Sequence, residues 1–226
     1  MMKRTFAVIG LGRFGSAMAT TLTELGHEVI GIDTDEERVA RIGDFVAQAI
    51  QLDATDEKAL RASGIADVDV AIISIGEKID SSLLVVMLVK ELEISTIIAK
   101  ATTALHGRIL EKLGVSRVIF PERDMAIRVA HSLVVPNVLD YIELSRYFSI
   151  VEVPAPAAFV GKTLRELALR TTHGLTLITV KRAARPGQDE TTIVAPLAEE
   201  RIEAGDVLSL LGPNERLSQL DRWLKE

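Results

Sequence analysis

Short apolar runs rich in β-branched residues alternate with longer amphipathic segments over the first 120 residues. Buried parallel strands give such runs, whereas a surface helix has an apolar residue at every third or fourth position. The runs predicted to be strands are 6–9, 28–32, 45–49, 68–74, 95–99 and 117–120. The segments predicted to be helices are 16–25, 36–42, 56–63, 78–92 and 105–113. Because the connections are too long for hairpins, the pattern predicts an α/β fold with a Rossmann-like, doubly wound parallel sheet.

The pattern changes after the sixth predicted strand. Residues 126–133 carry one apolar stripe at helical spacing, and residues 138–142 begin a second stripe after Pro136. No further strand follows for these helices to cross to, so residues 121–144 are predicted to be a helical arm beyond the sheet. Such an arm commonly packs on a second subunit, and plain core packing is the alternative.

The last part of the chain mixes the two periodicities. Strands are predicted at 148–153, 175–180, 191–194 and 206–211. Helices are predicted at 163–170 and 214–224, and an exposed turn at 185–189. These elements predict a small α+β domain. The predicted organisation is therefore a Rossmann domain over residues 1–135, a helical crossover over 136–147 and a C-terminal domain over 148–226.

Composition narrows the class of protein. The chain has 226 residues, of which 48% are hydrophobic and 26% charged, as in a folded globular protein. A net charge of -6 gives no global positive field, so nucleic-acid binding is not expected. Without cysteine there are no disulfides or cysteine zinc sites, which fits the cytosol. The N-terminus has no signal-peptide pattern and Leu83–Val89 is far shorter than the ~20 residues of a membrane span, so any membrane link is expected to need a partner.

A glycine-rich loop follows the first predicted strand and opens the first predicted helix. Its sequence is Gly10-Leu11-Gly12-Arg13-Phe14-Gly15, and its three glycines have the spacing of a dinucleotide-binding loop. Gly10 allows a tight turn, Gly12 lets a pyrophosphate approach the backbone, and Gly15 lets helix and strand pack closely. Asp33, at the end of the second strand, is placed to accept hydrogen bonds from ribose hydroxyls and to repel a 2′-phosphate. The loop therefore predicts a nucleotide site.

Further polar residues follow the other predicted strands. Ligands of open α/β sheets bind outside the carboxyl ends of the strands, so these residues are candidates to surround the nucleotide. Asp53 and Ala54 are expected near the adenine, and Lys100 near the phosphates. The alternative is that polar residues simply belong in loops. The candidates are Thr34, Asp35, Asp53, Ala54, Gly76, Glu77, Lys100, Ala101, Thr102 and Glu122.

Two charged residues bear on the phosphates. Arg13 stands inside the loop, where a guanidinium pairs readily with terminal phosphates, and this is favoured over a solvated surface charge. Glu122 stands at a predicted helix start, where spacing alone favours a role complementing the helix dipole. A carboxylate near phosphates makes sense mainly with a divalent cation between them.

No set of residues typical of catalysis accompanies the loop. The four histidines are scattered, and neither a nucleophile elbow nor a Walker loop occurs. A dehydrogenase usually adds a substrate domain about as large as the first, and the last part of the chain is too short for that. The sequence favours a nucleotide sensor that is not an enzyme, with an NAD-dependent oxidoreductase as the alternative.

Six segments of the sequence carry a resemblance to known proteins. They are Phe6–Gly15, Gly26–Val29, Lys100–Ala101, Leu110–Gly114, Pro121–Ala126 and Asn137–Leu144. Segments 121–126 and 137–144 are far more specific than the glycines. Together the segments resemble the cytosolic regulatory subunits of Ktr/Trk-type potassium uptake systems (the KtrA/TrkA family), which are regulator-of-potassium-conductance (RCK) proteins. The resemblance covers nearly the whole chain.

The resemblance implies a regulatory role. ATP, ADP and NAD(H) would compete for the glycine-loop crevice and change the activity of a membrane potassium channel or transporter. The chain would form homodimers that assemble into an octameric ring at the cytoplasmic face of the membrane. A regulator of a different cation channel or antiporter is the alternative, and nucleic acid is not an expected partner.

The resemblance also implies roles for residues. Arg13 would contact the γ-phosphate and Asp33 the ribose, while Glu122 would reach Mg²⁺ or another cation at the γ-phosphate of the nucleotide in the paired subunit. His106 is a further candidate, with a helix-surface position as the alternative. The implied nucleotide-binding residues are Gly10, Gly12, Arg13, Phe14, Gly15, Asp33, Thr34, Asp35, Asp53, Ala54, Gly76, Lys100, His106 and Glu122.

Some relatives bind cyclic di-AMP at the dimer interface of the C-terminal domain. The region that matches comprises Leu164, Leu167, Arg170, His173 and Pro196. Because any amphipathic helix would bury the two leucines, ordinary packing is the alternative for this region.

Overall fold

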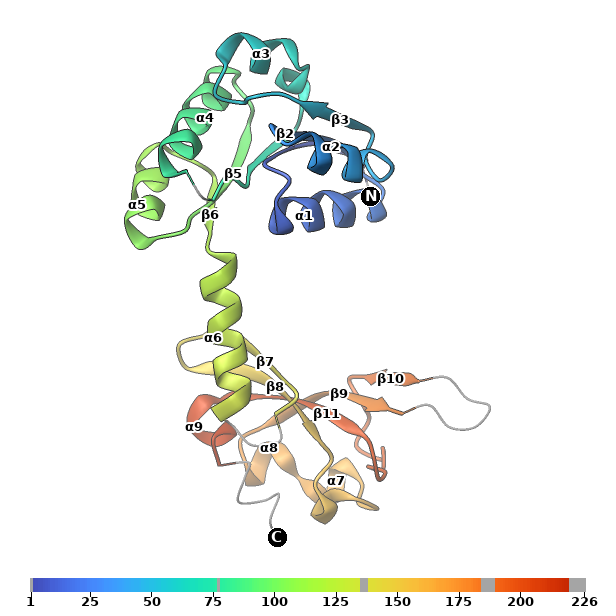
Figure 1. The fold of residues 1–226 in the computed structure, drawn as a ribbon. Helices are drawn as coiled ribbons and strands as arrows, with labels where there is room; N and C mark the ends of the chain where they lie inside the picture. Colours follow the sequence, from blue (N-terminus) through green and yellow to red (C-terminus); the bar gives the residue numbers. More distant parts are fainter. Residues whose placement is uncertain (1, 77, 135–137, 184–189, 220–226) are drawn as a thin grey trace. The chain divides into compact units, whose positions relative to one another are not determined.

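The computed structural model describes residues 2–76, 78–134, 138–183 and 190–219 (Figure 1). The chain divides into two compact units, Met1–Glu122 and Arg123–Glu226. Within the described residues, no helix combines the length and the apolar character that crossing a membrane requires. The two compact units are the N-terminal unit and the C-terminal unit of the chain.

The N-terminal unit is built on a parallel sheet. Its strands are β1 (Thr5–Ile9), β2 (Glu28–Asp33), β3 (Gln48–Gln51), β4 (Val70–Ile73), β5 (Thr96–Lys100) and β6 (Arg117–Ile119). They lie in the order β3-β2-β1-β4-β5-β6, and all neighbouring strands are parallel. The strand order reverses between β1 and β4, which is where ligands of such sheets bind. The doubly wound parallel sheet predicted from the sequence is confirmed.

Helices cover both faces of this sheet (Figure 1). They are α1 (Arg13–Glu24), α2 (Glu36–Gly43), α3 (Glu57–Ala62), α4 (Ile79–Glu91) and α5 (Ala104–Lys112), with a 3-10 turn η1 (Ile65–Asp67). Side chains alternate along β1, so Val8 packs with α1 and α2 on one face, whereas Ile9 packs with α3, α4 and α5 on the other. The hydrophobic runs of the sequence are strands buried on both sides.

The third strand differs from its prediction. It was expected at 45–49 and is found at Gln48–Gln51. The N–H of Phe45 donates to the Ile42 carbonyl at 2.9 Å, which continues the end of α2, and the Phe45 ring is exposed. Pairing of Gln48–Gln51 with the last residues of β2 then sets the register. An apolar ring outside the core had lengthened the apparent apolar run.

The C-terminal unit is an antiparallel α+β structure. Helix α6 (Pro121–Val134) leads into it, and the sheet order is β10-β9-β11-β8-β7. The strands are β7 (Asp140–Ser145), β8 (Phe148–Pro154), β9 (Thr176–Arg182), β10 (Thr191–Val194) and β11 (Val207–Pro213). The short helices are η2 (Ala157–Phe159), α7 (Leu164–Leu167), α8 (Leu169–Thr172) and α9 (Asn214–Leu217). The predicted small α+β domain is confirmed.

Two helix predictions in this unit are wrong. The second stripe of the arm, part of the predicted crossover 136–147, is strand β7, which pairs with β8 and brings the Tyr141 hydroxyl within 2.7 Å of Ser149 Oγ. The backbone hydrogen bonds of residues 140–145 are made with β8, the other strand of the hairpin. The apolar pattern of Val138, Leu139 and Ile142 could not show that such a partner strand exists. The helix predicted at 163–170 breaks into α7 and α8 because Ala168 is left-handed, at φ 46°.

The boundary between the two compact units lies after Glu122. The boundary of the nucleotide-binding domain at residue 135 stays a prediction. The turn predicted at 185–189 lies outside the described residues, as do Asn137, Glu77 and residues 220–224 of the predicted last helix.

Candidate nucleotide-binding site

The glycine loop joins β1 to α1, and each of its glycines meets a different demand. Gly10 has φ 95°, a left-handed conformation that favours glycine. A Cβ on Gly15 would lie 1.9 Å from the Gly10 carbonyl oxygen, so no side chain fits there. A Cβ on Gly12, the N-cap of α1, would meet nothing within 4 Å. The loop therefore leaves open space at the N-terminus of α1, where phosphate binding is favourable.

The start of α1 contains no anionic side chain. Its N-cap, Gly12, has no side chain to cap the helix, and none of the residues of its first turn, all of them described, is acidic. Backbone N–H groups at a helix N-terminus need acceptors, and the helix dipole favours a negative one. The geometry thus suits a phosphate, as the glycine spacing predicted.

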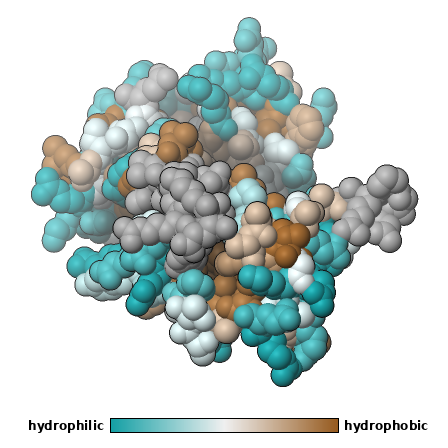
Figure 2. Space-filling model, turned by 90° about the horizontal axis from the view of Figure 1, so that it is seen from below, coloured by the Kyte–Doolittle hydropathy of each residue, from teal (hydrophilic) through white to brown (hydrophobic). Residues whose placement is uncertain are grey.

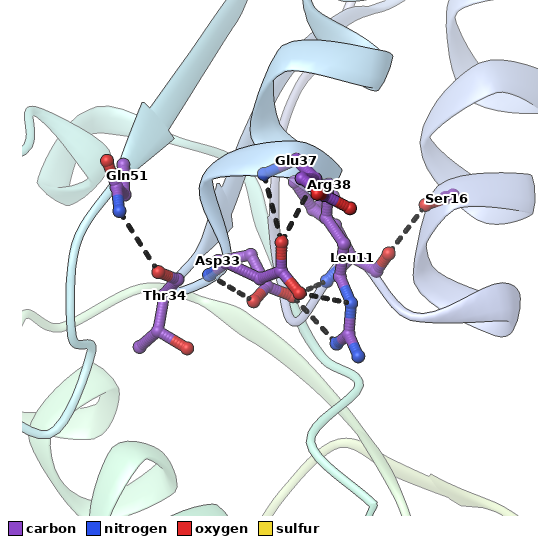
Figure 3. A network of polar contacts seen from close by, with 8 residues as sticks. Leu11, Ser16, Asp33, Thr34, Glu37, Arg38 and Gln51 are labelled. Atoms are coloured by element: carbon purple, nitrogen blue, oxygen red, sulfur yellow. Dashed lines mark hydrogen bonds and ion pairs between the residues drawn. The ribbon is translucent and has the colours of Figure 1, made fainter.

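Asp33 ends β2 and is tied to the loop (Figure 3). Its side chain is buried, with the residue only 8% exposed. Oδ2 accepts from the Leu11 N–H at 2.6 Å, and Oδ1 accepts from the Asp35 N–H at 2.9 Å. Because each carboxylate oxygen accepts about two hydrogen bonds, Oδ1 retains acceptor capacity for a ribose hydroxyl.

The residues after Asp33 are occupied with local structure. The Thr34 carbonyl accepts from Gln51 Nε2 at 3.2 Å, which links the ends of β2 and β3. Asp35 caps α2 and accepts from the N–H groups of Glu37 and Arg38 at 2.9 and 3.2 Å (Figure 3). Both predicted residues lie at the carboxyl end of β2, beside Asp33.

Asp53 and Ala54 follow β3 at the same edge of the sheet. Asp53 accepts from the Thr55 hydroxyl at 2.7 Å and from its N–H at 2.9 Å, and these bonds hold the pKa of the Asp53 carboxyl below its usual value. The Ala54 side chain is buried in the core with Ile9. Ala54 can therefore meet a nucleotide only through its backbone.

Four other predicted residues come together at the end of β5. Lys100 Nζ lies 2.5 Å from Glu122 Oε1 and 6.0 Å from the centre of the Phe14 ring. A Cβ on Gly76 would lie 3.4 Å from Lys100 Nζ, so the glycine lies beside the ammonium group. This group connects the glycine loop with the start of α6.

Glu122 is the acidic member of this group. Its side chain is 69% exposed, whereas that of Lys100 is mostly buried. The hydrogen bond from Lys100 holds the pKa of the Glu122 carboxyl below its usual value, and the positive charge of Arg13 adds to this effect. Glu122 is thus ionised at neutral pH and faces two cations of the crevice.

Arg13 opens α1 and is exposed. Among the described residues, none forms a hydrogen bond or ion pair with its guanidinium. A phosphate that reached this side chain would not have to displace any such partner.

His106 is not on the helix surface, contrary to the alternative given for it. The residue is 1% exposed in the first turn of α5, and its Nδ1 accepts from the Thr102 N–H at 3.4 Å. Nε2 is buried and has no partner among the described residues. Burial lowers the pKa of His106, so the imidazole is neutral at physiological pH. It lies behind the end of β5 rather than in open contact with a ligand.

Two of the five C-terminal candidates, both of them leucines, belong to or pack against the core. Leu167 is buried in the core of the C-terminal unit, and Leu164 packs against that core. Arg170 is exposed, while His173 and Pro196 are half-buried. The packing alternative accounts for the two leucines.

The sequence missed two contributors to the site. One is the Leu11 N–H, which donates to Asp33. It is a backbone group, so the type of residue at this position gives no signal of its role. The other is Arg38 on α2, whose Nη1 lies 3.5 Å from Asp33 Oδ2. Its position five residues after Asp33, the aspartate predicted to bind the ribose, was the available signal. Across the ranges that the structure describes, no three histidines or acidic residues cluster as a metal site.

Comparisons with known proteins confirm the family resemblance. The TrkA-N domain matches residues 6–121 and the TrkA-C domain matches residues 148–225. The chain is 40% identical to the Ktr system potassium uptake protein C of Bacillus subtilis, over 98% of this chain and 97% of that protein. It is 36% identical to the Ktr system potassium uptake protein A of the same organism, over 96% of each chain.

A solved structure shares the fold. The GsuK channel bound to NAD has a TM-score of 0.63 and 19% sequence identity to this chain. The match covers 100% of this chain but only 40% of the channel chain, so the likeness concerns the fold alone. The domain matches and the Bacillus relatives establish that this chain belongs to the TrkA-N/TrkA-C family of Ktr system potassium uptake proteins.

Proposed function

We propose that this chain is a nucleotide-sensing regulatory subunit of a Ktr/Trk-type potassium uptake system and is not an enzyme. The observation that carries the proposal is the 40% identity to a Ktr system potassium uptake protein over nearly the whole of both chains. The proposal places the nucleotide-binding domain at residues 1–135 and an RCK C-terminal domain at residues 148–226. The subunit acts at the cytoplasmic face of the membrane through a membrane-protein partner.

The nucleotide occupies the crevice at the ends of β1, β2, β4 and β5. ATP, ADP and NAD(H) share an adenosine 5′-phosphate, which suits Asp33 at one end and the open N-terminus of α1 at the other. The GsuK channel, a protein of the same fold, has been solved bound to NAD, which supports nucleotide binding by this chain. Binding to two conformations with unequal affinity shifts the population between them, so no bond of the nucleotide needs to break.

The γ-phosphate distinguishes ATP from ADP. It would reach the guanidinium of Arg13 and compete with Glu122 for Lys100. Glu122, released from Lys100, would be free to bind Mg²⁺ or another cation at a γ-phosphate of the paired subunit. Glu122 stands at the start of α6, where one unit ends and the next begins. The exchange of partners would therefore change the contacts of a residue at this boundary.

Homodimers, assembled into an octameric ring, are the proposed form of the protein. Helix α6 carries Met125, Val129 and Leu133 four residues apart on one face, and all three are exposed. Leu133 is 79% exposed, which is costly for a large apolar side chain unless another surface covers it. The C-terminal unit exposes further apolar side chains among hydrophilic ones (Figure 2), including Val194 and Leu197.

Leu133→Glu is expected to shift the protein from dimer to monomer. A carboxylate at this position of α6 would have to be buried without a partner in the proposed interface. Light scattering after size exclusion measures the mass. The control is Leu25→Glu, which makes the same change at an exposed leucine after α1. A Leu133→Glu variant with unchanged mass would contradict a dimer through this face.

The function is tested by isolating the chain with its partner. Membrane proteins encoded beside it are expected to co-purify, and mass spectrometry of the complex is expected to find an adenine nucleotide. Potassium uptake by cells that produce both proteins should require this chain. Uptake that is the same without it would contradict the regulatory role.

The oxidoreductase alternative has its own test. NADH incubated with candidate carbonyl substrates is expected to remain unoxidised, because the proposal gives the crevice neither a substrate pocket nor an acid to protonate the carbonyl oxygen as hydride is transferred. Sustained turnover would instead make the chain an enzyme. Binding of cyclic di-AMP by the C-terminal unit stays a prediction, and calorimetry without heat on its addition would remove it.

A further inference from the structure

Arg38 stands at the nucleoside end of the crevice, beside the aspartate assigned to the ribose (Figure 3). Its Nη1 lies 3.5 Å from Asp33 Oδ2, and its Nε lies 3.4 Å from Asp35 Oδ2. The side chain is 44% exposed, so it can also face a ligand. No other role assigned to the crevice uses this cation.

The backbone holds Arg38 in place. Its N–H donates to Asp35 Oδ1 at 3.2 Å, as part of the cap of α2, while the guanidinium turns back to the other oxygen of the same carboxylate. Asp35 thus anchors Arg38 at both its backbone and its side chain. The contact to Asp33 is made by a different nitrogen, Nη1, and can change without loss of this anchor.

After the second strand of a dinucleotide-binding fold, arginine and aspartate favour different groups at the 2′ position of the ribose. An acidic residue after the second strand accepts from the ribose 2′-hydroxyl, whereas a nearby arginine accommodates a 2′-phosphate. Here two carboxylates share one guanidinium, and Glu36 and Glu37 add negative charge in the first turn of α2. The local charge is negative, so a 2′-phosphate is repelled although a suitable cation is present.

We propose that Arg38 is a specificity-determining residue of the crevice: while paired with Asp33 it leaves the site selective for a free 2′-hydroxyl, and without that pairing it binds a 2′-phosphate. The ligand class is therefore adenine nucleotides unmodified at the ribose. This inference rests on the proposed binding of adenine nucleotides in the N-terminal unit.

The test compares two probes that differ only by the 2′-phosphate, AMP and adenosine 2′,5′-bisphosphate. Both share the adenosine 5′-phosphate of ATP, ADP and NAD. Their dissociation constants are measured by calorimetry, or by competition against ATP, on the full chain. The wild type is expected to prefer AMP. Asp33→Asn keeps an oxygen for the Leu11 N–H and removes the charge, so the ratio should move at least about tenfold toward the bisphosphate.

Two further variants assign that gain to Arg38. In Asp33→Asn/Arg38→Ala the gain should disappear, because the cation that binds the added phosphate is gone. Arg38→Ala alone should strengthen the preference for AMP by several-fold, and this variant keeps the test decisive if Asp33→Asn fails to fold. Arg41→Ala removes the same charge from an exposed position of α2 and should leave the ratio unchanged.

The outcomes separate this inference from the function it rests on. If the wild type binds ATP, and Arg38→Ala leaves the ratio of the two probes as Arg41→Ala does, Arg38 is only a surface residue and the inference is wrong. If the wild type binds neither ATP nor either probe, the proposed nucleotide site itself is wrong.

Discussion

Gly15→Ala is expected to destabilise the N-terminal unit by about 3 kcal/mol, the upper part of the range for overpacking a tight site. The added Cβ would lie 1.9 Å from the Gly10 carbonyl oxygen and 3.0 Å from its carbon. Both are backbone atoms of the loop after β1, so no side-chain rotation can relieve the clash. Thermal denaturation followed by circular dichroism should show the transition of this unit roughly 10 °C lower.

Gly12→Ala is the matched control in the same loop. Gly12 has φ -64°, which any residue adopts, and its Cβ would meet nothing within 4 Å. This variant should keep its unfolding temperature but bind ATP about tenfold more weakly, since a methyl group would occupy the approach of the phosphates. Equal stability of the two variants would contradict the packing role of Gly15. Unchanged ATP affinity of Gly12→Ala would contradict the phosphate site.

Arg13→Ala is expected to weaken ATP binding by about tenfold to a hundredfold and ADP binding much less. A charge-assisted hydrogen bond contributes about 1.5–3 kcal/mol, which corresponds to this range. The guanidinium stands at the first position of α1, beside the proposed phosphate site. Its positive charge also lowers the pKa of the Glu122 carboxyl. Calorimetric titration of each nucleotide measures the two losses.

The ratio of the losses decides the role of Arg13. Equal losses for ATP and ADP would refute its contact with the γ-phosphate. Arg41→Ala supplies the matched control, since it removes one positive charge from an exposed helix position of the same unit. That control should change neither affinity, because a distant exposed charge is screened by salt.

Much of the N-terminal unit could be predicted because its signals are local. Strands buried on both faces give unbroken apolar runs, and the glycine loop stands between a strand and a helix whatever surrounds it. The prediction placed the start of β3 three residues too early because it took Phe45 as part of the strand. The Phe45 ring is in fact exposed, and this exposure depends on where α2 ends. Local sequence therefore gave the order of the elements better than their ends.

The elements that depend on distant partners could not be predicted. Strand β7 forms because β8 pairs with it. Residues 138–142 do not show the alternation of apolar and polar side chains that would predict a strand. The burial of His106 depends on how α5 packs behind the sheet. The bond from the Leu11 N–H to Asp33 joins a backbone group to a carboxylate 22 residues away. The mutual contacts of the candidate site residues were therefore not predictable from the sequence.

The central claim is that the crevice of the N-terminal unit binds adenine nucleotides as signals. Its most direct test is the unfolding temperature of the wild-type chain with ATP, ADP or NADH. Ligand at 100 times its dissociation constant stabilises the folded state by about 2.7 kcal/mol, so each nucleotide should raise the transition of this unit by several degrees. An unfolding temperature that none of the three nucleotides changes would contradict the claim.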